Sequence, residues 1–267
     1  MDNAAEQLVW EEPVRIHTFD VGPDNRATAP ALGKYLQEAA SRQAASLGFG
    51  YDNLGENDLF WVLSRLAVEV YRYPRWNEEL SLYTWPAGLA PPYALRSFRL
   101  ISSSGETVAE AGSAWLTIEA STRRPRRVET VIDAKQYEQA ERVLADRLTR
   151  IRVPERASSA ASTALLHAWE ETRRVRPSDL DGQNHTNNMT YLEWILDGFD
   201  GPQPSELELK SFRMNFLKET HNGDLVELWY VPLDATETET IGMSGIALQN
   251  GGGPVVSTEL TFVPRRA

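Results

Sequence analysis

The chain has 267 residues, of which 42% are hydrophobic, so it can bury a sizeable core in one large domain or two of moderate size. Its formal net charge of −11 argues against a nucleic-acid-binding protein, whose binding surface is usually basic, and gives no sign of affinity for an anionic membrane surface. It has no cysteine, which excludes disulfides, thiolate catalysis and cysteine-based metal sites.

The same features predict where the protein is found. The absence of a disulfide framework fits a reducing compartment. Residues 1–13 are acidic and have no apolar core segment, which predicts that they are not a signal peptide. No stretch approaches the roughly 18 consecutive apolar residues of a membrane-spanning helix. We therefore expect a cytoplasmic protein without a membrane span.

The first part of the chain predicts one long helix followed by antiparallel strands. A strand-like segment at residues 14–19 leads to Pro30, which suits the first turn of a helix, with Thr28 or Ala29 near its cap. Apolar residues then recur at spacings of three and four until Gly48, where the helix is expected to end. The period changes to two after that, which predicts strands around residues 66–70, 80–84, 93–101 and 107–119.

The middle of the chain has a different composition. Residues 134–149 are charged and favour a helix, and residues 157–163 are small and polar, which is typical of a linker. We therefore expect a helical connector over residues 131–163, which would join an N-terminal domain of residues 1–130 to a C-terminal domain of residues 164–267.

The last part of the chain repeats the layout of the first. A strand around residues 166–176 precedes a polar cluster, and an amphipathic helix follows over residues 189–199. Later strands are expected at residues 207–216 (with a one-residue slip near Lys210), 226–230, 243–248 and 256–262, with a tight turn at 251–254. Two copies of strand, helix and antiparallel strands predict an α+β fold in which a sheet wraps around each long helix.

The polar cluster lies directly ahead of the second helix. Residues 179–188 contain two carboxylates, four side-chain amides and one imidazole. The start of a helix has unpaired backbone N–H groups and a partial positive charge, so it can stabilise a developing anion. The combination indicates chemistry on a carbonyl group.

Taken together, these residues resemble the acyl-acyl carrier protein thioesterases of plants and bacteria, which are built as a double hotdog. In the first half the resemblance is carried by residues 36–40 (LQEAA), 61–65 (WVLSR), 73–76 (YPRW), 84–85 (TW), Trp115 and 122–124 (TRR). In the second half it is carried by Asp179, Asp181, His185, Asn187, Asn188, Tyr191 and residues 194–196 (WIL). The resemblance covers nearly the whole chain.

The resemblance also implies an active site. The family's run Asp-x-Asn-x-His is similar to Asp181–His185 here, and a Glu follows about one strand later, which matches Glu219, 34 residues (219 − 185) after the histidine. The implied catalytic set is therefore Asp181, Gln183, His185 and Glu219. There are two departures: Gln183 replaces the family's asparagine, and Thr220 replaces a cysteine found in many plant members.

Each of these residues has a simpler interpretation when it is taken alone. His185 could cap the helix or satisfy a buried group, and Asp181 could be an ordinary helix cap. Glu219 could be a solvent-facing glutamate ahead of a turn. We expect Asn187 and Asn188 to cap the helix and fasten the loop, and Asp179 to be structural, since the matched motif begins two residues later.

The function implied is hydrolysis of fatty acyl-acyl carrier protein to a free fatty acid in fatty acid biosynthesis. The partner would be an acyl carrier protein with a phosphopantetheine-linked acyl chain, with no cofactor or metal, and the enzyme could be a homodimer. The helix start of the first half has no histidine or carboxylate, so that half is expected to form the acyl pocket. One alternative is an acyl-CoA thioesterase of the same fold. The other is a non-catalytic acyl-binding or regulatory protein, and the one feature that favours it is Gln183 in place of the family's asparagine.

Residues 123–127 hold four arginines in an otherwise acidic chain. Such a run is usually a solvated face. It could instead dock an acidic carrier protein and its phosphate group, and the sequence leaves both interpretations open.

Overall fold

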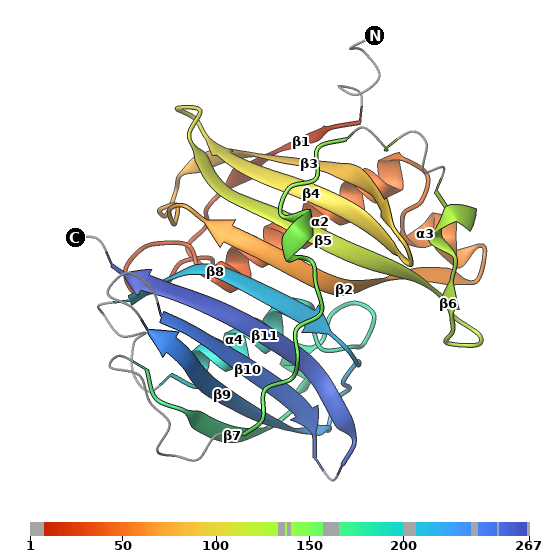
Figure 1. The fold of residues 1–267 in the computed structure, drawn as a ribbon. Coiled ribbons are helices and arrows are strands. Elements are labelled where there is room, and N and C mark those ends of the chain that lie inside the picture. The colour runs from red at the N-terminus through yellow and green to blue at the C-terminus, as the bar shows by residue number, and fades with distance from the viewer. Residues whose placement is uncertain are drawn as a thin grey trace. The chain divides into compact units, whose positions relative to one another are not determined.

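The chain folds into two compact units, Met1–Thr149 (unit 1) and Arg150–Ala267 (unit 2), in a computed structural model (Figure 1). The structure describes residues 8–132, 137, 140–156, 166–199, 207–235, 240–249 and 251–265. The expected connector, residues 131–163, is divided between the two units. Residues 157–163, expected to be a linker, lie outside the described residues.

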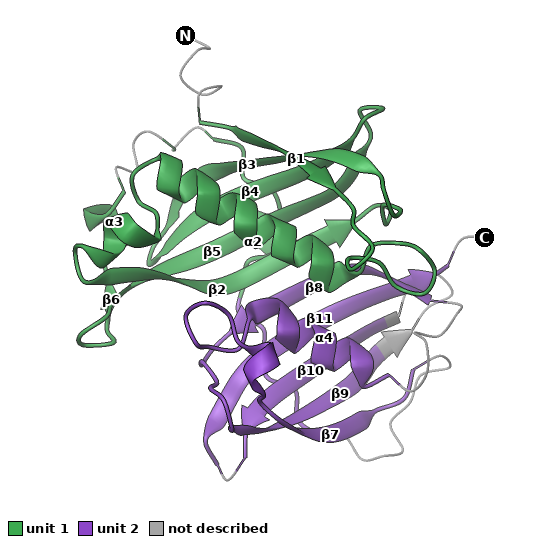
Figure 2. Ribbon diagram, turned by 180° about the vertical axis from the view of Figure 1, so that it is seen from behind, with its two compact units in different colours: residues 1–149 green, residues 150–267 purple. Residues whose placement is uncertain are grey.

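Unit 1 is an antiparallel sheet with one long helix on one of its faces (Figure 2). Its strands lie in the order β1-β3-β4-β5-β2, and β6 pairs with β5. Its elements are β1 (Trp10–Arg15), α2 (Ala29–Ser46), α3 (Tyr51–Gly55), β2 (Leu59–Val70), β3 (Glu79–Ala90), β4 (Tyr93–Ser102), β5 (Thr107–Glu119) and β6 (Pro125–Arg126), with 3-10 turns at Val128–Thr130 and Ala145–Arg147.

Helix α2 begins and ends where the residues predict. The Thr28 side chain caps it by accepting a hydrogen bond from the Ala31 N–H at 3.3 Å, and Pro30 occupies its first turn. Apolar residues on one face of the helix, among them Leu32 and Ala39, are buried. The helix prediction from Pro30 to Gly48 is thus confirmed, and Gly48 takes the left-handed conformation, with φ of +80°, that ends many helices.

The first strand lies earlier in the chain than residues 14–19, the segment expected to hold it. Strand β1 covers Trp10–Arg15 and includes Pro13. Proline removes a backbone donor, so it is tolerated in a strand that has a neighbour on one side only. Among the described strands of unit 1, β1 pairs with β3 alone.

The helix expected over residues 134–149 is wrong for the part that the structure describes. Residues 140–149 hold only the 3-10 turn Ala145–Arg147 and cross the sheet of unit 1 on the face away from α2 (Figure 1). Val143 and Leu148 are buried there against Trp85 and Leu95. Side chains of the sheet hold this segment: the Trp85 Nε1–H donates to the Glu141 carbonyl at 2.8 Å. Tertiary contacts therefore override the local preference for a helix.

Unit 2 repeats this layout with a shorter helix. Its strands lie in the order β8-β11-β10-β9-β7. Its elements are β7 (Trp169–Arg174), a 3-10 turn at Pro177–Asp179, α4 (Asn188–Asp197), β8 (Leu207–Phe216), β9 (Leu225–Ala235), β10 (Thr240–Leu248) and β11 (Gly253–Pro264). The slip expected near Lys210 is a bulge: Thr261 pairs with Ser211, but Phe262 pairs with Leu209.

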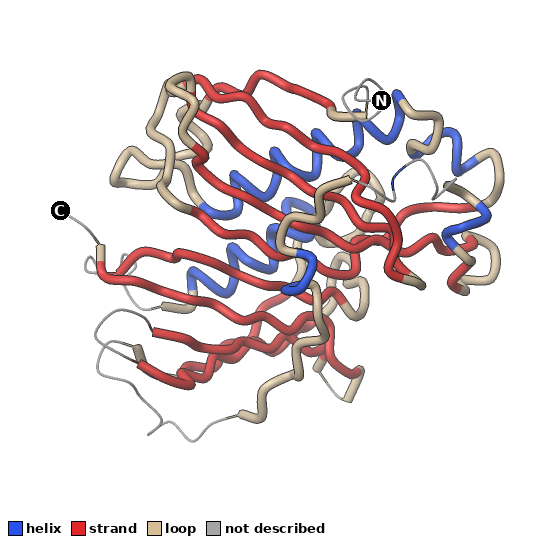
Figure 3. The backbone as a smooth tube through the Cα atoms, turned by 45° about the horizontal axis from the view of Figure 1, so that its top comes forward, coloured by secondary structure: helices blue, strands red, loops and turns tan. Residues whose placement is uncertain are grey.

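Helix α4 lies against the sheet of unit 2 (Figure 3), and its apolar side is buried. Met189, Leu192 and Ile195 are completely buried. At its end Gly198 lies so close to Trp169 that an added Cβ would be 2.4 Å from the indole ring, which only glycine allows. The observed helix, Asn188–Asp197, matches the expected helix over residues 189–199 to within two residues at each end.

The two units together confirm the α+β class, with antiparallel strands in sequence and few helices. Within the described part of the chain, no helix combines the length and the apolarity needed to cross a bilayer.

Candidate active site

A tight turn ahead of α4 holds the predicted site residues in place. The Asp181 N–H donates to the His185 carbonyl at 2.8 Å, and the Asn184 N–H donates to the Asp181 carbonyl at 3.0 Å. Asn184 has φ of +63°, a left-handed conformation that asparagine tolerates better than most residues. The turn brings the backbone back on itself, so that Leu180 and Thr186 form an isolated β-bridge.

The Asp181 carboxylate stabilises this turn. Its Oδ1 accepts hydrogen bonds from the backbone N–H of Gln183 at 2.9 Å and of His185 at 3.4 Å. This is the local side-chain-to-backbone bonding typical of aspartate in turns. Asp181 thus fixes the backbone from which the His185 side chain extends.

Asp179 stabilises the loop ahead of α4, which is the structural role expected of it. Its Oδ2 accepts a hydrogen bond from the Arg176 N–H at 2.6 Å, and its carbonyl accepts one from the Asn187 N–H at 2.9 Å. Asn187 in turn caps α4, because its Oδ1 accepts from the Met189 N–H at 2.9 Å. These bonds fasten the loop to the start of the helix.

A buried cluster of hydroxyl groups ties this turn to the loop between β8 and β9. The Thr220 carbonyl accepts a hydrogen bond from the Thr186 N–H at 2.9 Å. The Thr220 hydroxyl lies 2.7 Å from the Thr186 hydroxyl and 2.8 Å from that of Tyr191. Burial raises the pKa of Tyr191, so its phenol stays protonated. Thr220 therefore has a structural role here, because it connects the turn ahead of α4 to the loop after β8.

Substituting Thr220 tests this connection. Thr220→Val keeps the shape of a fully buried side chain but removes the hydroxyl, which takes away the 2.8 Å hydrogen bond to the Tyr191 hydroxyl and the 2.7 Å one to the Thr186 hydroxyl. We expect the free energy of unfolding to fall by about 1–3 kcal/mol. Urea denaturation measures the change, and Thr220→Ser, which keeps the hydroxyl, should lose less. Equal stability of Thr220→Val and the wild type would contradict this account.

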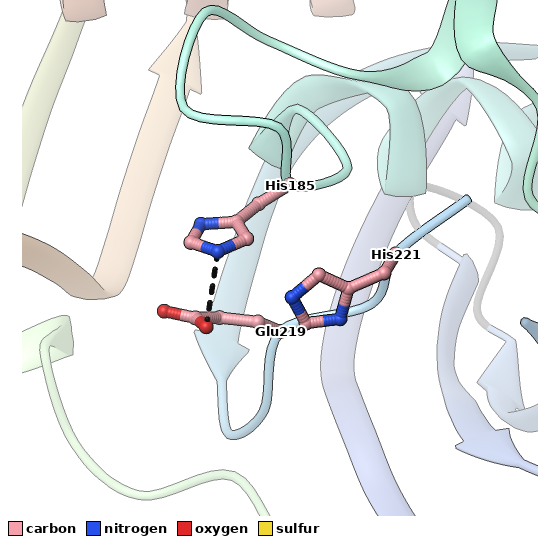
Figure 4. Close-up of side chains that lie close together, drawn as sticks. All are labelled: His185, Glu219 and His221. Carbon is pink, nitrogen blue, oxygen red and sulfur yellow. Dashed lines mark ion pairs between the residues drawn. The ribbon is translucent and has the colours of Figure 1, made fainter. Parts of the chain in front are cut away.

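The connection between the turn and the loop brings His185 and Glu219 together. The His185 Nε2 lies 3.3 Å from Glu219 Oε2, with the two side chains 19% and 36% exposed (Figure 4). Glu219 follows the end of β8 at Phe216, which confirms the expected place near a strand end. Two residues that are far apart in the sequence are thus placed for proton transfer or for joint binding of a water molecule.

Asp181 and Gln183, the other two predicted site residues, differ in their surroundings from the His185–Glu219 pair. The Asp181 carboxylate is bonded to the turn. The Gln183 side chain is exposed, and it makes no hydrogen bond within the part of the chain that the structure describes. At the helix start, the Met189 N–H is bonded to the Asn187 side chain and the Thr190 N–H to the Asn187 carbonyl. Of the first three N–H groups of α4, only that of Asn188 has no partner among the residues that the structure describes, so it remains for an anionic oxygen.

His221 joins the site, and sequence reasoning missed it. Its ring meets that of His185 edge to face, with centroids 5.0 Å apart. One ligand atom from each of His185, Glu219 and His221 lies within 4.8 Å of the other two, so these side chains could hold a metal ion. Residues at i and i+2 in extended chain share a side, so the spacing of His221 from Glu219 was a usable signal. The segment was interpreted only as a turn.

Unit 1 contains the same turn without these side chains. The Gly22 N–H donates to the Arg26 carbonyl at 2.9 Å, and the Ala27 N–H donates to the Pro74 carbonyl at 2.8 Å. These bonds correspond to those of Asp181 and Thr186 in unit 2. Arg26 therefore occupies the place of His185, and the residue before Pro74, Tyr73, occupies that of Glu219.

The arginine run of residues 123–127 is exposed at the edge of unit 1. Arg126 forms an ion pair with Glu119 at 2.8 Å, and the Arg123 guanidinium lies 5.4 Å from the centre of the Phe60 ring. These contacts fit a solvated face, and docking of a carrier protein stays a prediction.

Both parts of the chain match domains of one known protein family. The N-terminal domain of the acyl-ACP thioesterases matches residues 7–135, and the C-terminal domain matches residues 164–261. An oleoyl-acyl carrier protein thioesterase of Coriandrum sativum is 25% identical over 259 residues, covering 90% of this chain and 68% of the relative.

Two solved structures are also similar. An acyl-ACP thioesterase from Bacteroides thetaiotaomicron has a TM-score of 0.80 and 27% identity, covering 97% of this chain and 99% of that one. The 12:0-ACP thioesterase from Umbellularia californica has a TM-score of 0.82 and 22% identity, covering 96% and 94%, which shows the shared fold. Because the two family domains match most of its length, this chain belongs to the acyl-ACP thioesterase family.

Proposed function

We propose that this chain hydrolyses the thioester of fatty acyl-acyl carrier protein and releases a free fatty acid and the carrier protein. The observation that carries the proposal is the His185–Glu219 pair, with Nε2 and Oε2 3.3 Å apart beside the start of α4. The family match of both domains supports the same reaction.

The chemistry can be written with the groups that lie at this site. Glu219 accepts a proton from a water molecule as the water oxygen attacks the thioester carbonyl carbon. His185 orients that water and stabilises the negative charge, with the Asn188 N–H as a backbone donor for the anionic oxygen. The C–S bond then breaks, and the proton passes from Glu219 to the leaving sulfur. Asp181 keeps His185 in place through the turn.

The two units have different parts in this proposal. Each unit would be one hotdog, with α2 or α4 as the central helix. Unit 1 has Arg26 and Tyr73 where unit 2 has His185 and Glu219, which supports an acyl-binding role in place of a second active site.

The carrier is tested by comparing substrates. Purified wild-type protein is assayed on acyl-acyl carrier protein and acyl-CoA of the same chain lengths, with release of the free thiol measured. We expect higher kcat/KM on the carrier protein across the panel. Preference for acyl-CoA would favour an acyl-CoA thioesterase. Binding of acyl chains without turnover would favour the non-catalytic acyl-binding alternative.

Gln183 gives a second test of the same reaction. If its side-chain amide takes the part of the family's asparagine, Gln183→Asn should keep most of the activity, and Gln183→Ala should lose about 10²–10³-fold in kcat. The side chain is exposed, so neither variant should change the stability measured by urea denaturation. Full activity of Gln183→Ala would remove this residue from the catalytic set.

The proposal also covers how the carrier protein docks, where the enzyme is located and whether it forms a dimer. The carrier protein's phosphopantetheine arm would bring the thioester to unit 2, with residues 123–127 as one candidate docking surface. The lack of cysteine supports a cytoplasmic, reducing location. A homodimer stays a prediction.

A further inference from the structure

The His185, Glu219 and His221 side chains have the donor set of a transition-metal site. One ligand atom from each lies within 4.8 Å of the others, and one ring nitrogen of His221 faces the other two side chains (Figure 4). Two imidazoles and one carboxylate are ligands that Zn²⁺ takes in sites with one open position. The chain has no cysteine, so no thiolate competes for the ion.

We infer that these three side chains bind Zn²⁺ and that the bound ion inhibits the enzyme reversibly. Zinc bonds to nitrogen and oxygen are about 2.0–2.2 Å long, which places two tetrahedral ligand atoms about 3.3 Å apart. The His185 Nε2 and Glu219 Oε2 are already 3.3 Å apart. Only His221 has to approach, and its side chain is 52% exposed at a loop, where it can rotate.

A carboxylate behind His221 supports the site independently. Asp224 Oδ2 lies 3.9 Å from the His221 Nδ1 and also accepts a hydrogen bond from the His221 backbone N–H at 2.9 Å. Metal-binding histidines usually direct their second ring nitrogen at a carboxylate or carbonyl, which sets the tautomer and the ring orientation. Because Asp224 lies on the Nδ1 side of the ring, the nitrogen of His221 that faces His185 and Glu219 is Nε2.

The expected consequence is loss of hydrolysis while zinc is bound. The ion would occupy the His185 nitrogen and the Glu219 oxygen that the reaction uses. This inhibition rests on the proposed function, whereas metal binding does not. The zinc inferred here is an inhibitor, so it differs from the metal cofactor whose absence the family resemblance implied.

The binding test uses tag-free protein that has been treated with EDTA and desalted. Zinc chloride is titrated against a chromophoric chelator, and the visible absorption of added Co²⁺ gives an independent reading of the ligand geometry. We expect one ion per chain, with His221→Ala and Glu219→Gln each weakening binding about tenfold or more. His167→Ala, which removes an exposed histidine of unit 2 outside the cluster, should bind like the wild type.

The activity test uses the same proteins with acyl-acyl carrier protein. Zinc should abolish wild-type hydrolysis, and excess EDTA should restore it. His221→Ala, measured relative to its own metal-free rate, should keep its activity at zinc concentrations that abolish wild-type hydrolysis. Equal zinc affinity in His221→Ala and the wild type, or no binding by the wild type, would overturn the site. A rise in rate with zinc would overturn the inhibition. If no variant hydrolyses the substrate, the titration still decides the metal site, so the two proposals fail separately.

Discussion

The Glu219→Gln variant is expected to lower kcat/KM for acyl-acyl carrier protein by about 10²–10⁴-fold. Glutamine keeps the size of the side chain but cannot accept the proton of the attacking water. The loss should fall mainly on kcat, because proton transfer belongs to the transition state and the substrate still binds. Thiol release over a range of substrate concentrations separates kcat from KM.

Glu170→Gln provides the matched control for this variant. Glu170 is an exposed glutamate of β7 in the same unit, and its change should leave the rate close to that of the wild type. Circular dichroism confirms that both variants fold. A folded Glu219→Gln protein with wild-type kcat would mean that this carboxylate is not the general base. Another group would then have to accept the proton of the attacking water.

The second large effect is expected for His185→Ala, with a loss of about 10²–10⁴-fold in kcat/KM. The imidazole lies next to Glu219 and on the turn that Asp181 holds, so its removal takes away the group that orients the water. The double variant with Glu219→Gln should be only slightly slower than the slower single variant, because residues that act as a unit are not additive.

His167→Ala is the control for this second prediction, since it removes another exposed histidine of unit 2. The rates of the wild type, the two single variants and the double variant form a double-mutant cycle, which measures the coupling between His185 and Glu219. Losses that multiply in the double variant would show that His185 and Glu219 act independently. A wild-type rate from folded His185→Ala would exclude the imidazole from the reaction.

Much of the fold follows from local patterns. The apolar spacing before Gly48 and after Asn187 sets both long helices, and the change of period near Lys210 marks a bulge that the pairing of β8 with β11 contains. The secondary-structure prediction is wrong where contacts with residues distant in the sequence determine the backbone conformation. The segment with Val143 is charged and favours a helix, but its apolar side chains are buried on a sheet face and its backbone bonds to sheet side chains. Helix α3 has only five residues, too few for a period to be seen.

The candidate site was predictable to a different degree. His185 and Glu219 could be paired only through the family resemblance, because periodicity says nothing about contacts between a turn and a loop 34 residues (219 − 185) later. The hydrogen bonds of Thr220 depend on side-chain directions in that loop, which one sequence does not reveal, whereas the spacing of His221 from Glu219 was a usable signal. Asp181 was expected in the catalytic set; its carboxylate bonds to the turn, and a catalytic role for it stays a prediction.

The turn ahead of the helix contains a left-handed asparagine in both units. Asn184 has φ of +63° and Asn25 has φ of +65° at the matching place in unit 1, where no catalytic pair exists. Backbone strain at an active site is often taken as part of the mechanism. Here the same conformation persists in a unit without the chemistry, so it is a condition for entering the helix. The left-handed asparagine therefore belongs to the turn that both units share, and it is no evidence of strain put in place for catalysis.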